Sequence, residues 1–368
     1  MIGEVFVRAT TAALDDLRDR LHRHRPVPRA DVDGTAGFDP DLVTALIRYW
    51  ATEFDWRAQE DRIAGLDWVQ TERTDVPVRA VLSEADLSEA AGSRAPVVVL
   101  LHGWPDSVLR FERIFPRLRD VSVVAPALPG FPFSAPVPRG LSSVEMADAV
   151  AAAMTEFGVD RYTVSAGDVG CDVAEALAAR HPDRVASLHL TDVSQYHFLA
   201  GLPPDLDDEE VAYVERGRRW QAAEGGYMHQ QSTRPDTLAV GLGDSPAGLA
   251  AWIVEKLVRW TDCDGDLFRV FSYDEVLTWV TAYWLTGTIG TSFGPYATQA
   301  AKDWPRVEAP TVFTLFAHDL VNAPRQFANR HFAVADWREF ARGGHFAAWE
   351  RPDDYVWGLR RALQAGGR

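Results

Sequence analysis

Short, continuous runs of apolar residues recur through the middle of the chain. Runs of this kind, rich in valine and leucine and nearly free of charge, are typical of parallel strands that are buried on both faces. Segments with helical spacing separate several of them, and this alternation predicts a mostly parallel sheet with crossover helices. The predicted strands cover 77–82, 96–101, 121–125, 162–165, 185–190, 311–316 and 337–340, and the clearest helices cover 143–157, 171–180 and 353–364.

Two other parts of the chain have a helical pattern. Near the N-terminus, Leu14, Leu17 and Leu21 recur at helical spacing, and a second helix is predicted over 41–53. A later block, rich in tryptophan, interrupts the strands, as is typical of a cap over an active site. These patterns predict an N-terminal helical region over 1–75 that packs on core and cap, a core formed by 76–194 and 306–368, and a helical cap over 195–305.

Composition and charge narrow the class of protein. The 368 residues carry a formal net charge of −16, which disfavours binding to nucleic acids and to anionic membrane surfaces. The two cysteines fit a reducing compartment, and the sequence starts without a basic segment followed by an apolar one. We therefore expect a cytoplasmic protein with no nucleic-acid or membrane partner. The sequence offers no metal-ligand cluster or nucleotide-binding fingerprint, so we expect no cofactor and no metal, and it leaves homo-oligomerisation open.

The sharpest local motif is Ala-Gly-Asp-Val-Gly at 166–170. It follows a predicted strand and precedes a predicted helix, and small residues stand two positions before and two after Asp168. This spacing matches the strained turn that presents the nucleophile in α/β-hydrolases, with aspartate in place of the usual serine. The alternative is a glycine-rich loop in which Asp168 only caps the helix.

A second motif, His-Gly-Trp-Pro at 102–105, directly follows a predicted buried strand. In this fold such a loop supplies one backbone N–H to an oxyanion hole, and the residue after the nucleophile supplies the other. The predicted donors are therefore the backbone N–H groups of Trp104 and Val169. A simple turn is the alternative, because glycine and proline also mark ordinary loops.

Two further residues complete a predicted triad. His345 lies on a glycine-flanked loop near the C-terminus and suits a general base, and Asp319 follows a predicted strand and suits the acid that orients the histidine. The chain order of nucleophile, acid and histidine is that of α/β-hydrolases. Asp192, which ends the preceding strand, is the alternative acid. Asp172 is interpreted as a solvated or capping residue.

Over nearly its whole length the sequence resembles the microsomal-type epoxide hydrolases. The resemblance is carried by segments 14–21, 49–57, 102–105, 126–131, 226–230, 244–251, 283–289 and 342–348. It implies an α/β-hydrolase fold with a mostly parallel central sheet, an inserted helical cap and an N-terminal helical extension. It also implies Asp168 as nucleophile, His345 as base and Asp319 as acid, with Tyr227 and Tyr296 as hydrogen-bond donors to the epoxide oxygen.

The reaction implied by this resemblance converts an epoxide and water to a vicinal diol. Attack by the Asp168 carboxylate leaves an ester that water can cleave, whereas attack by a serine would leave an ether. Water activated by His345 then hydrolyses the ester. The aromatic cap indicates an apolar, aromatic epoxide as substrate. We expect the cavity to be uncharged apart from Asp168, Asp319 and His345.

The sequence departs from the family pattern at three positions. Ala166 and Val169 replace a glycine and a tryptophan at the turn, and Gly294 stands where an arginine is common before the second tyrosine. A haloalkane dehalogenase is one alternative, but it needs a halide-binding tryptophan where this chain has Val169. An inactive relative that binds small molecules is another. Detoxification, aromatic hydrocarbon catabolism and secondary-metabolite biosynthesis are equally compatible with the sequence.

Overall fold

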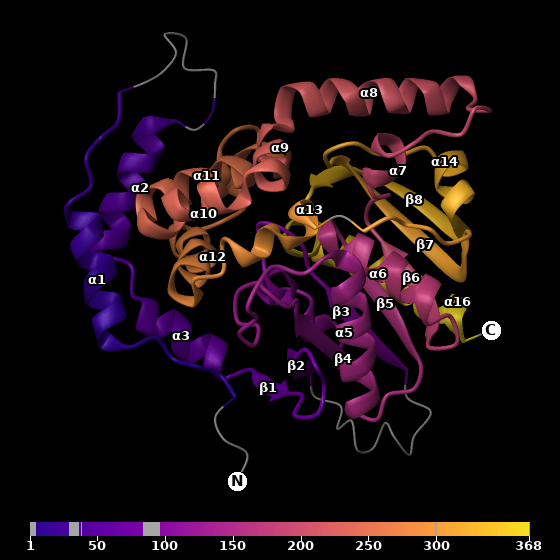
Figure 1. Ribbon diagram of the computed structural model, residues 1–368, viewed down its shortest axis with the longest axis horizontal. Coiled ribbons are helices and arrows are strands. Elements are labelled where there is room, and N and C mark those ends of the chain that lie inside the picture. Colours follow the sequence, from indigo (N-terminus) through magenta and orange to yellow (C-terminus); the bar gives the residue numbers. More distant parts are fainter. Residues whose placement is uncertain (1–4, 29–36, 38, 84–95, 299, 368) are drawn as a thin grey trace.

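The computed structural model describes residues 5–28, 37, 39–83, 96–298 and 300–367. A central sheet carries helices on its faces, a helical cap covers one edge of it, and further helices run along one side of the molecule (Figure 1). The strands are β1 (Asp67–Gln70), β2 (Arg79–Ser83), β3 (Val97–Leu101), β4 (Ser122–Ala127), β5 (Tyr162–Ala166), β6 (Val185–Leu190), β7 (Val307–His318) and β8 (Phe332–Gly344).

The eight strands lie in the order β1-β2-β4-β3-β5-β6-β7-β8. The pairings β1–β2 and β2–β4 are antiparallel, and all pairings from β4 through β3 to β8 are parallel. Val97–Leu101 is completely buried, as its unbroken apolar run predicts. In a parallel sheet of this kind, ligands bind beyond the carboxyl ends of the strands, and β5 occupies the centre.

Helices that connect the parallel strands, and the helix that follows the last strand, cover the sheet. α5 and α6 pack against each other, and α16 packs on β5 to β8 (Figure 1). A capping box joins Ser142 and Glu145 and fixes the start of α5. The core helices are α5 (Ser143–Glu156), α6 (Val169–Arg180), α14 (Arg325–His331), α15 (Ala347–Glu350) and α16 (Pro352–Gly366), with the short 3-10 turns η1 (Val108–Phe111) and η2 (Phe115–Arg117).

The cap is a run of helices between β6 and β7. Its helices are α7 (Tyr196–Leu199), α8 (Asp208–Glu224), α9 (Gly226–Thr233), α10 (Pro235–Asp244), α11 (Pro246–Trp260), α12 (Tyr273–Thr286) and α13 (Gly294–Ala297), with the 3-10 turns η3 (Leu267–Arg269) and η4 (Thr291–Phe293). Together with the parallel sheet and the N-terminal helices, this confirms the predicted fold class. Within the described part of the chain no single helix is long and apolar enough to span a membrane, although α10 and α11 together reach that length and composition across a bend of 114°.

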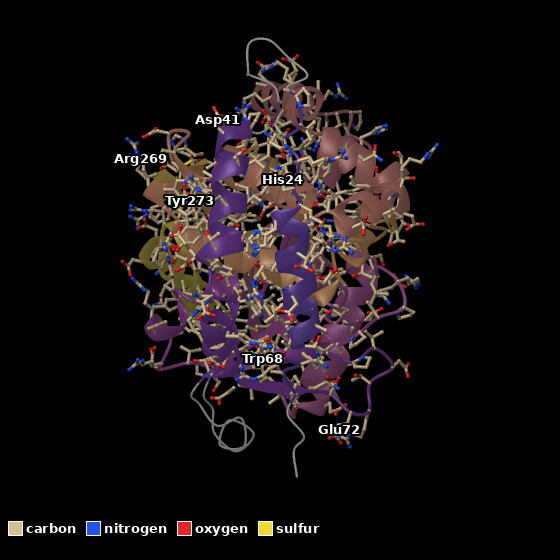
Figure 2. All side chains as sticks on the ribbon, turned by 90° about the vertical axis from the view of Figure 1, so that its left-hand side faces the viewer. His24, Asp41, Trp68, Glu72, Arg269 and Tyr273 are labelled. Carbon is tan, nitrogen blue, oxygen red and sulfur yellow. The ribbon has the colours of Figure 1, made fainter. Side chains whose placement is uncertain are left out.

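The N-terminal helices brace the cap. They are α1 (Thr11–His22), α2 (Pro40–Thr52) and α3 (Trp56–Ala64). Figure 2 shows this side of the molecule, where α1 and α2 contact α11 and α2 also contacts α12. An ion pair of 2.7 Å between Arg20 and Asp244 and a hydrogen bond of 3.0 Å from Tyr49 to Asp274 join the two regions.

Two N-terminal elements are absent from the sequence prediction. α3 follows α2 directly, and β1 lies within the first 75 residues but pairs with β2 of the core sheet. The sheet therefore begins before residue 76, where the sequence pattern placed the start of the core.

Candidate active site

Asp168 occupies a strained turn between β5 and α6. Its φ of 58° lies in a region that side-chain-bearing residues rarely adopt. Glycines make the turn possible, because a Cβ on Gly170 would lie 2.3 Å from the Leu101 carbonyl oxygen and one on Gly103 would lie 2.4 Å from Asp168 Oδ1. Asp168 precedes the first turn of α6, so the positive end of the helix dipole also favours its negative charge. The motif forms a strained turn between a strand and a helix, which is the local structure that its spacing predicts.

His345 lies between two carboxylates. Its Nε2 is 3.1 Å from Asp168 Oδ2, and its Nδ1 is 2.7 Å from Asp319 Oδ1. Asp319 is thus the acid that contacts the histidine. Asp192 accepts hydrogen bonds from the backbone N–H of Asp168 at 3.0 Å and from the Cys171 thiol at 2.9 Å, so it supports the turn instead.

The pKa values of these groups move in opposite directions. Burial lowers the pKa of His345, but the charges of Asp319 and Asp168 and their hydrogen bonds outweigh burial and raise it well above its ordinary value. Burial raises the pKa of Asp168, but His345 and backbone N–H groups outweigh it and lower that pKa. Burial, with the nearby charge of Asp319, raises the pKa of Asp192 to about 7. The geometry therefore favours an ionised Asp168 beside a histidine that readily holds a proton.

Two backbone N–H groups converge on the Asp168 carboxylate. The Trp104 N–H donates to Oδ1 over 2.7 Å, and the Val169 N–H lies close enough to the carboxylate to help lower its pKa. These are the two donors predicted from the sequence. A tetrahedral oxyanion formed at this carboxyl carbon would lie within reach of both donors.

Tyr227 and Tyr296 reach the same place from the cap. The Tyr227 ring stacks on Trp104 with centroids 5.2 Å apart, and the Tyr296 ring meets Trp104 edge-on at 6.0 Å. The two tyrosine rings are themselves 6.0 Å apart. Burial and the Asp168 charge raise the pKa of both hydroxyls well above the ordinary value, so both remain protonated donors. The structure thus places both predicted tyrosines in the same cavity as Asp168.

Several supporting residues were not identified from the sequence. Buried Arg110 donates to the His345 carbonyl over 2.8 Å and pairs with Asp106 at 2.7 Å, and Asp106 accepts the Gly103 N–H. One buried ion pair therefore ties the loop that carries Trp104 to the loop that carries His345. The spacing of Asp106 and Arg110 on one turn is the signal that identifies such a pair, but charged residues at this spacing are usually solvated.

A second supporting carboxylate is Glu350. It accepts backbone N–H groups of Gly344 at 2.9 Å, of Phe346 at 2.9 Å and of Asp262 at 2.8 Å. Burial outweighs these bonds and raises the pKa of Glu350 to about 7. The residues on either side of His345 are therefore both fixed by one side chain, which limits how far the imidazole can move.

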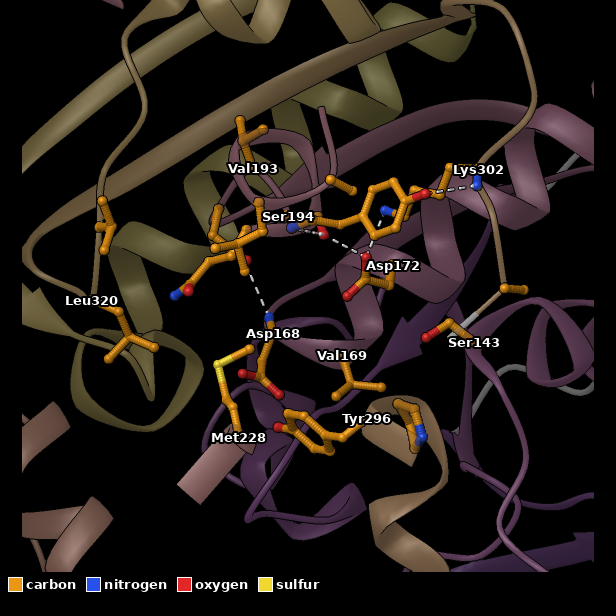
Figure 3. A pocket seen from close by; sticks show the side chains of 18 of the residues that line it. Ser143, Asp168, Val169, Asp172, Val193, Ser194, Met228, Tyr296, Lys302 and Leu320 are labelled. Carbon is orange, nitrogen blue, oxygen red and sulfur yellow. Dashed lines mark hydrogen bonds and ion pairs between the residues drawn. The ribbon is translucent and has the colours of Figure 1, made fainter. Parts of the chain in front are cut away.

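A cavity of about 330 Å³ contains the reacting groups and falls within the size range of small-molecule sites. Apolar side chains next to Asp168 include Val169, Met228 and Leu320 (Figure 3). The cavity also contains Asp172, Lys302 and Asp192, so the expectation of a cavity charged only at the triad is wrong. Asp172 is not a simple solvated or capping residue, because it forms an ion pair of 2.5 Å with Lys302.

The departures from the family pattern have local explanations. A Cβ on Gly294 would lie 2.4 Å from the backbone N of Leu141, so a larger residue does not fit with this backbone. Gly294 therefore allows α13 to approach the core closely, and Tyr296 still reaches Trp104. Val169 lines the cavity and is much smaller than tryptophan, so it leaves room beside the nucleophile.

The fold and the site together define an α/β-hydrolase with an aspartate at the strained turn between β5 and α6. Residues 3–111 match the family model described as epoxide hydrolase N terminus, and residues 96–222 match the α/β hydrolase fold. A Stigmatella aurantiaca protein named "Putative epoxide hydrolase" is 32% identical over 96% of this chain and 82% of its own length. The chain belongs to the microsomal-type epoxide hydrolase family, and it is an epoxide hydrolase that acts on an ether bond, as the sequence resemblance implies.

A mammalian relative and a solved structure match this chain over nearly its whole length. Epoxide hydrolase 1 of Sus scrofa is 29% identical over 97% of this chain and 87% of its own length. The structure of Aspergillus niger epoxide hydrolase superimposes with a TM-score of 0.83 at 27% identity, and it covers 98% of this chain and 94% of that one. The similarity therefore includes the N-terminal region and the cap as well as the core.

Proposed function

We propose that this epoxide hydrolase opens an apolar, aromatic epoxide through a covalent aspartyl ester and releases a vicinal diol. The observation that carries the proposal is the contact of one histidine with two carboxylates, at 3.1 Å to Asp168 and 2.7 Å to Asp319, directly beneath two buried tyrosines. One carboxylate is available as nucleophile, and the other holds the imidazole.

In the first step, Asp168 Oδ2 or Oδ1 attacks a ring carbon and the carbon–oxygen bond of the ring breaks. The negative charge passes from the carboxylate to the former ring oxygen. Tyr227 and Tyr296 donate hydrogen bonds to that oxygen, and one of them transfers its proton to it. An ionised Asp168 is needed for this attack, and the lowered pKa of Asp168 supports it.

In the second step, His345 removes a proton from water and the hydroxide attacks the ester carbonyl. The backbone N–H groups of Trp104 and Val169 stabilise the resulting oxyanion. Asp319 holds the imidazole in the required tautomer and stabilises the imidazolium. When the tetrahedral species collapses, the imidazolium gives its proton to the leaving alkoxide and the diol departs. The proton left on the Asp168 carboxyl group returns to the tyrosinate, so that Asp168 becomes a carboxylate again. No step calls for a group other than water and these side chains.

Aromatic and apolar side chains in the cavity support an apolar, aromatic substrate. Tyr227, Tyr296, Val169 and Met228 line the cavity, and the Tyr227 ring stacks on buried Trp104 with centroids 5.2 Å apart. These side chains place apolar surface near Asp168, where an aryl group on the epoxide would exclude water.

Isotope labelling tests the ester route. A single turnover of styrene oxide in 18O-labelled water should yield unlabelled diol and place the label in the Asp168 carboxylate, because water attacks the ester carbonyl. Label appearing directly in the diol would show attack of water on the ring and would contradict the proposal. Steady release of halide from chloroalkanes would instead support the dehalogenase alternative.

A further inference from the structure

Lys302 is an unusual residue in this chain. The sequence has 37 lysine and arginine residues, but only Lys256 and Lys302 are lysines. The Lys302 side chain is 8% exposed, lines the cavity and lies 5.3 Å from the centre of the Tyr196 ring. Burying an ammonium group is costly in free energy unless the group is paired with an opposite charge.

Two carboxylates of α6 pair with this ammonium group. Lys302 Nζ lies 2.5 Å from Asp172 Oδ1 and 2.6 Å from Glu175 Oε2. Glu175 is 2% exposed and uses both oxygens, because His197 also contacts Oε2 at 3.0 Å and the Trp304 indole donates to Oε1 at 3.1 Å. Glu175 therefore fixes Lys302 from the protein side.

Asp172 is placed differently from Glu175. It lines the cavity, and 28% of its side chain is exposed. Its contacts with Lys302 and with the Ser194 hydroxyl, at 2.5 Å, both use Oδ1. Among the described residues, these contacts leave Oδ2 available to a ligand. Lys302 also keeps one of its three ammonium protons beyond those directed to the two carboxylates.

The geometry points to a polar subsite, formed by Asp172 and Lys302, that selects epoxides carrying a neutral hydroxyl group. A hydroxyl can donate to Asp172 Oδ2 and accept from Lys302 at once. An anionic substituent would face two carboxylates balanced by one ammonium, and a cationic one would lie beside Lys302. This inference rests on the proposed function, because it assumes that the epoxide ring lies at Asp168.

The position of the subsite sets the size of the substrate. Asp168 directly precedes α6, Asp172 lies in the first turn of that helix, and both residues line the cavity. Figure 3 shows Asp172, Ser194 and Lys302 on one side of the pocket and Asp168 with Tyr296 on the other. An aryl ring between the epoxide and a para hydroxymethyl group would contact the apolar wall and direct the hydroxyl toward Asp172.

Two substrates of matched shape test the subsite. 4-(Hydroxymethyl)styrene oxide and 4-ethylstyrene oxide differ only by an oxygen in place of a methyl carbon. We expect the wild-type enzyme to favour the alcohol in kcat/KM by at least about tenfold, since a hydrogen bond to a charged group is worth that much. The double variant Asp172→Leu/Lys302→Met should erase this preference, so that the two epoxides react with similar kcat/KM.

Further variants protect the test against misfolding. Asp172→Asn keeps the shape of the side chain and should reduce the preference in the same direction. Glu210→Gln alters a buried carboxylate that pairs with Arg330 on α14 outside the cavity, and should leave the preference unchanged. Equal wild-type kcat/KM for the two epoxides, or a preference that survives the double variant, would overturn the subsite. If neither epoxide gives a diol, the proposed function itself fails.

Discussion

The core side and the cap side of the cavity are held in different ways. On the core side, Asp168, His345 and Asp319 each follow the end of a sheet strand. Hydrogen bonds of 2.7 to 3.1 Å hold these side chains in place. On the cap side, Tyr227 and Tyr296 are held by ring contacts with Trp104 at 5.2 and 6.0 Å. Hydrogen bonds fix direction to within a narrow range, whereas ring contacts tolerate small shifts.

This difference assigns separate tasks to the two sides. Under the proposed mechanism, the core fixes the distance between carboxylate and imidazole, on which both chemical steps depend. The cap would supply donors to the epoxide oxygen and the walls that meet the rest of the substrate, and it contacts α1 and α2, for example through the Arg20–Asp244 pair. Loss of the contact that orients His345 should therefore nearly abolish turnover, whereas loss of one cap tyrosine hydroxyl should lower the rate less.

The largest expected effect among single changes that preserve shape is that of Asp319→Asn. The amide no longer stabilises the imidazolium or selects the tautomer that contacts Asp168, and such a change in a related triad lowers kcat by about 10⁴-fold. Steady-state kinetics with styrene oxide measures it. A loss of only a few-fold would show that the 2.7 Å contact of Asp319 with His345 does not carry the chemistry.

Single changes on the cap side should cost less. Tyr227→Phe and Tyr296→Phe each remove one donor to the developing alkoxide, and each should lower the rate of ester formation by about 10²- to 10³-fold. The double variant should lose considerably more, because no donor remains. Tyr162→Phe, which removes a buried hydroxyl at the start of β5 outside the cavity, is the control and should react normally. An unchanged rate in both single variants would place the epoxide oxygen elsewhere.

The rates of ester formation and ester hydrolysis should depend differently on pH. Asp168 keeps its charge in acid because its pKa is lowered, whereas His345 has a raised pKa and must lose its proton to activate water. As pH falls, ester hydrolysis should therefore slow by up to about tenfold per pH unit while ester formation persists, because one proton blocks the base. Rapid-mixing experiments should show an ester that accumulates more in acid. A parallel decline of both steps would contradict the assignment of roles.

The smallest expected effect comes from the other acid in the core. Asp192→Asn keeps an oxygen that can accept the Asp168 N–H, and the raised pKa of Asp192 means that its charge is already easily lost near neutral pH. We expect kcat within about tenfold of wild type, because the Asp168 N–H would donate to a neutral amide oxygen in place of a carboxylate oxygen. A loss as large as that of Asp319→Asn would remove the distinction between the two carboxylates.

Much of the fold and the core side of the site follows from the sequence. A strand that is buried on both faces appears in the sequence as an unbroken apolar run, and the turn at Asp168 is marked by glycines. Both features can therefore be recognised from neighbouring residues. The sequence signals for β1 and α3 are weaker. β1 has only four residues, of which one is exposed and three are half-buried, and the inner face of α3 carries Glu60, which accepts the Trp56 indole N–H at 3.1 Å. A buried acid interrupts the apolar stripe by which a helix is identified.

The polar subsite could not be predicted in the same way. Lys302 and Glu175 are 127 positions apart, and neither sequence segment shows that Lys302 packs against the first turns of α6. A charged residue is usually solvated, so the pattern alone favours the surface for Asp172, Glu175 and Lys302. Only the folded chain shows that Asp172 and Lys302 meet inside the cavity.

The central claim is that Asp168 forms a covalent ester that His345 then helps to cleave. His345→Gln should keep the first step, because Trp104 and Val169 still hold the carboxylate, and should block the second. After mixing with styrene oxide, mass spectrometry should show one equivalent of adduct on the Asp168 peptide. Normal turnover by this variant with no adduct, or an adduct on another residue, would contradict the account.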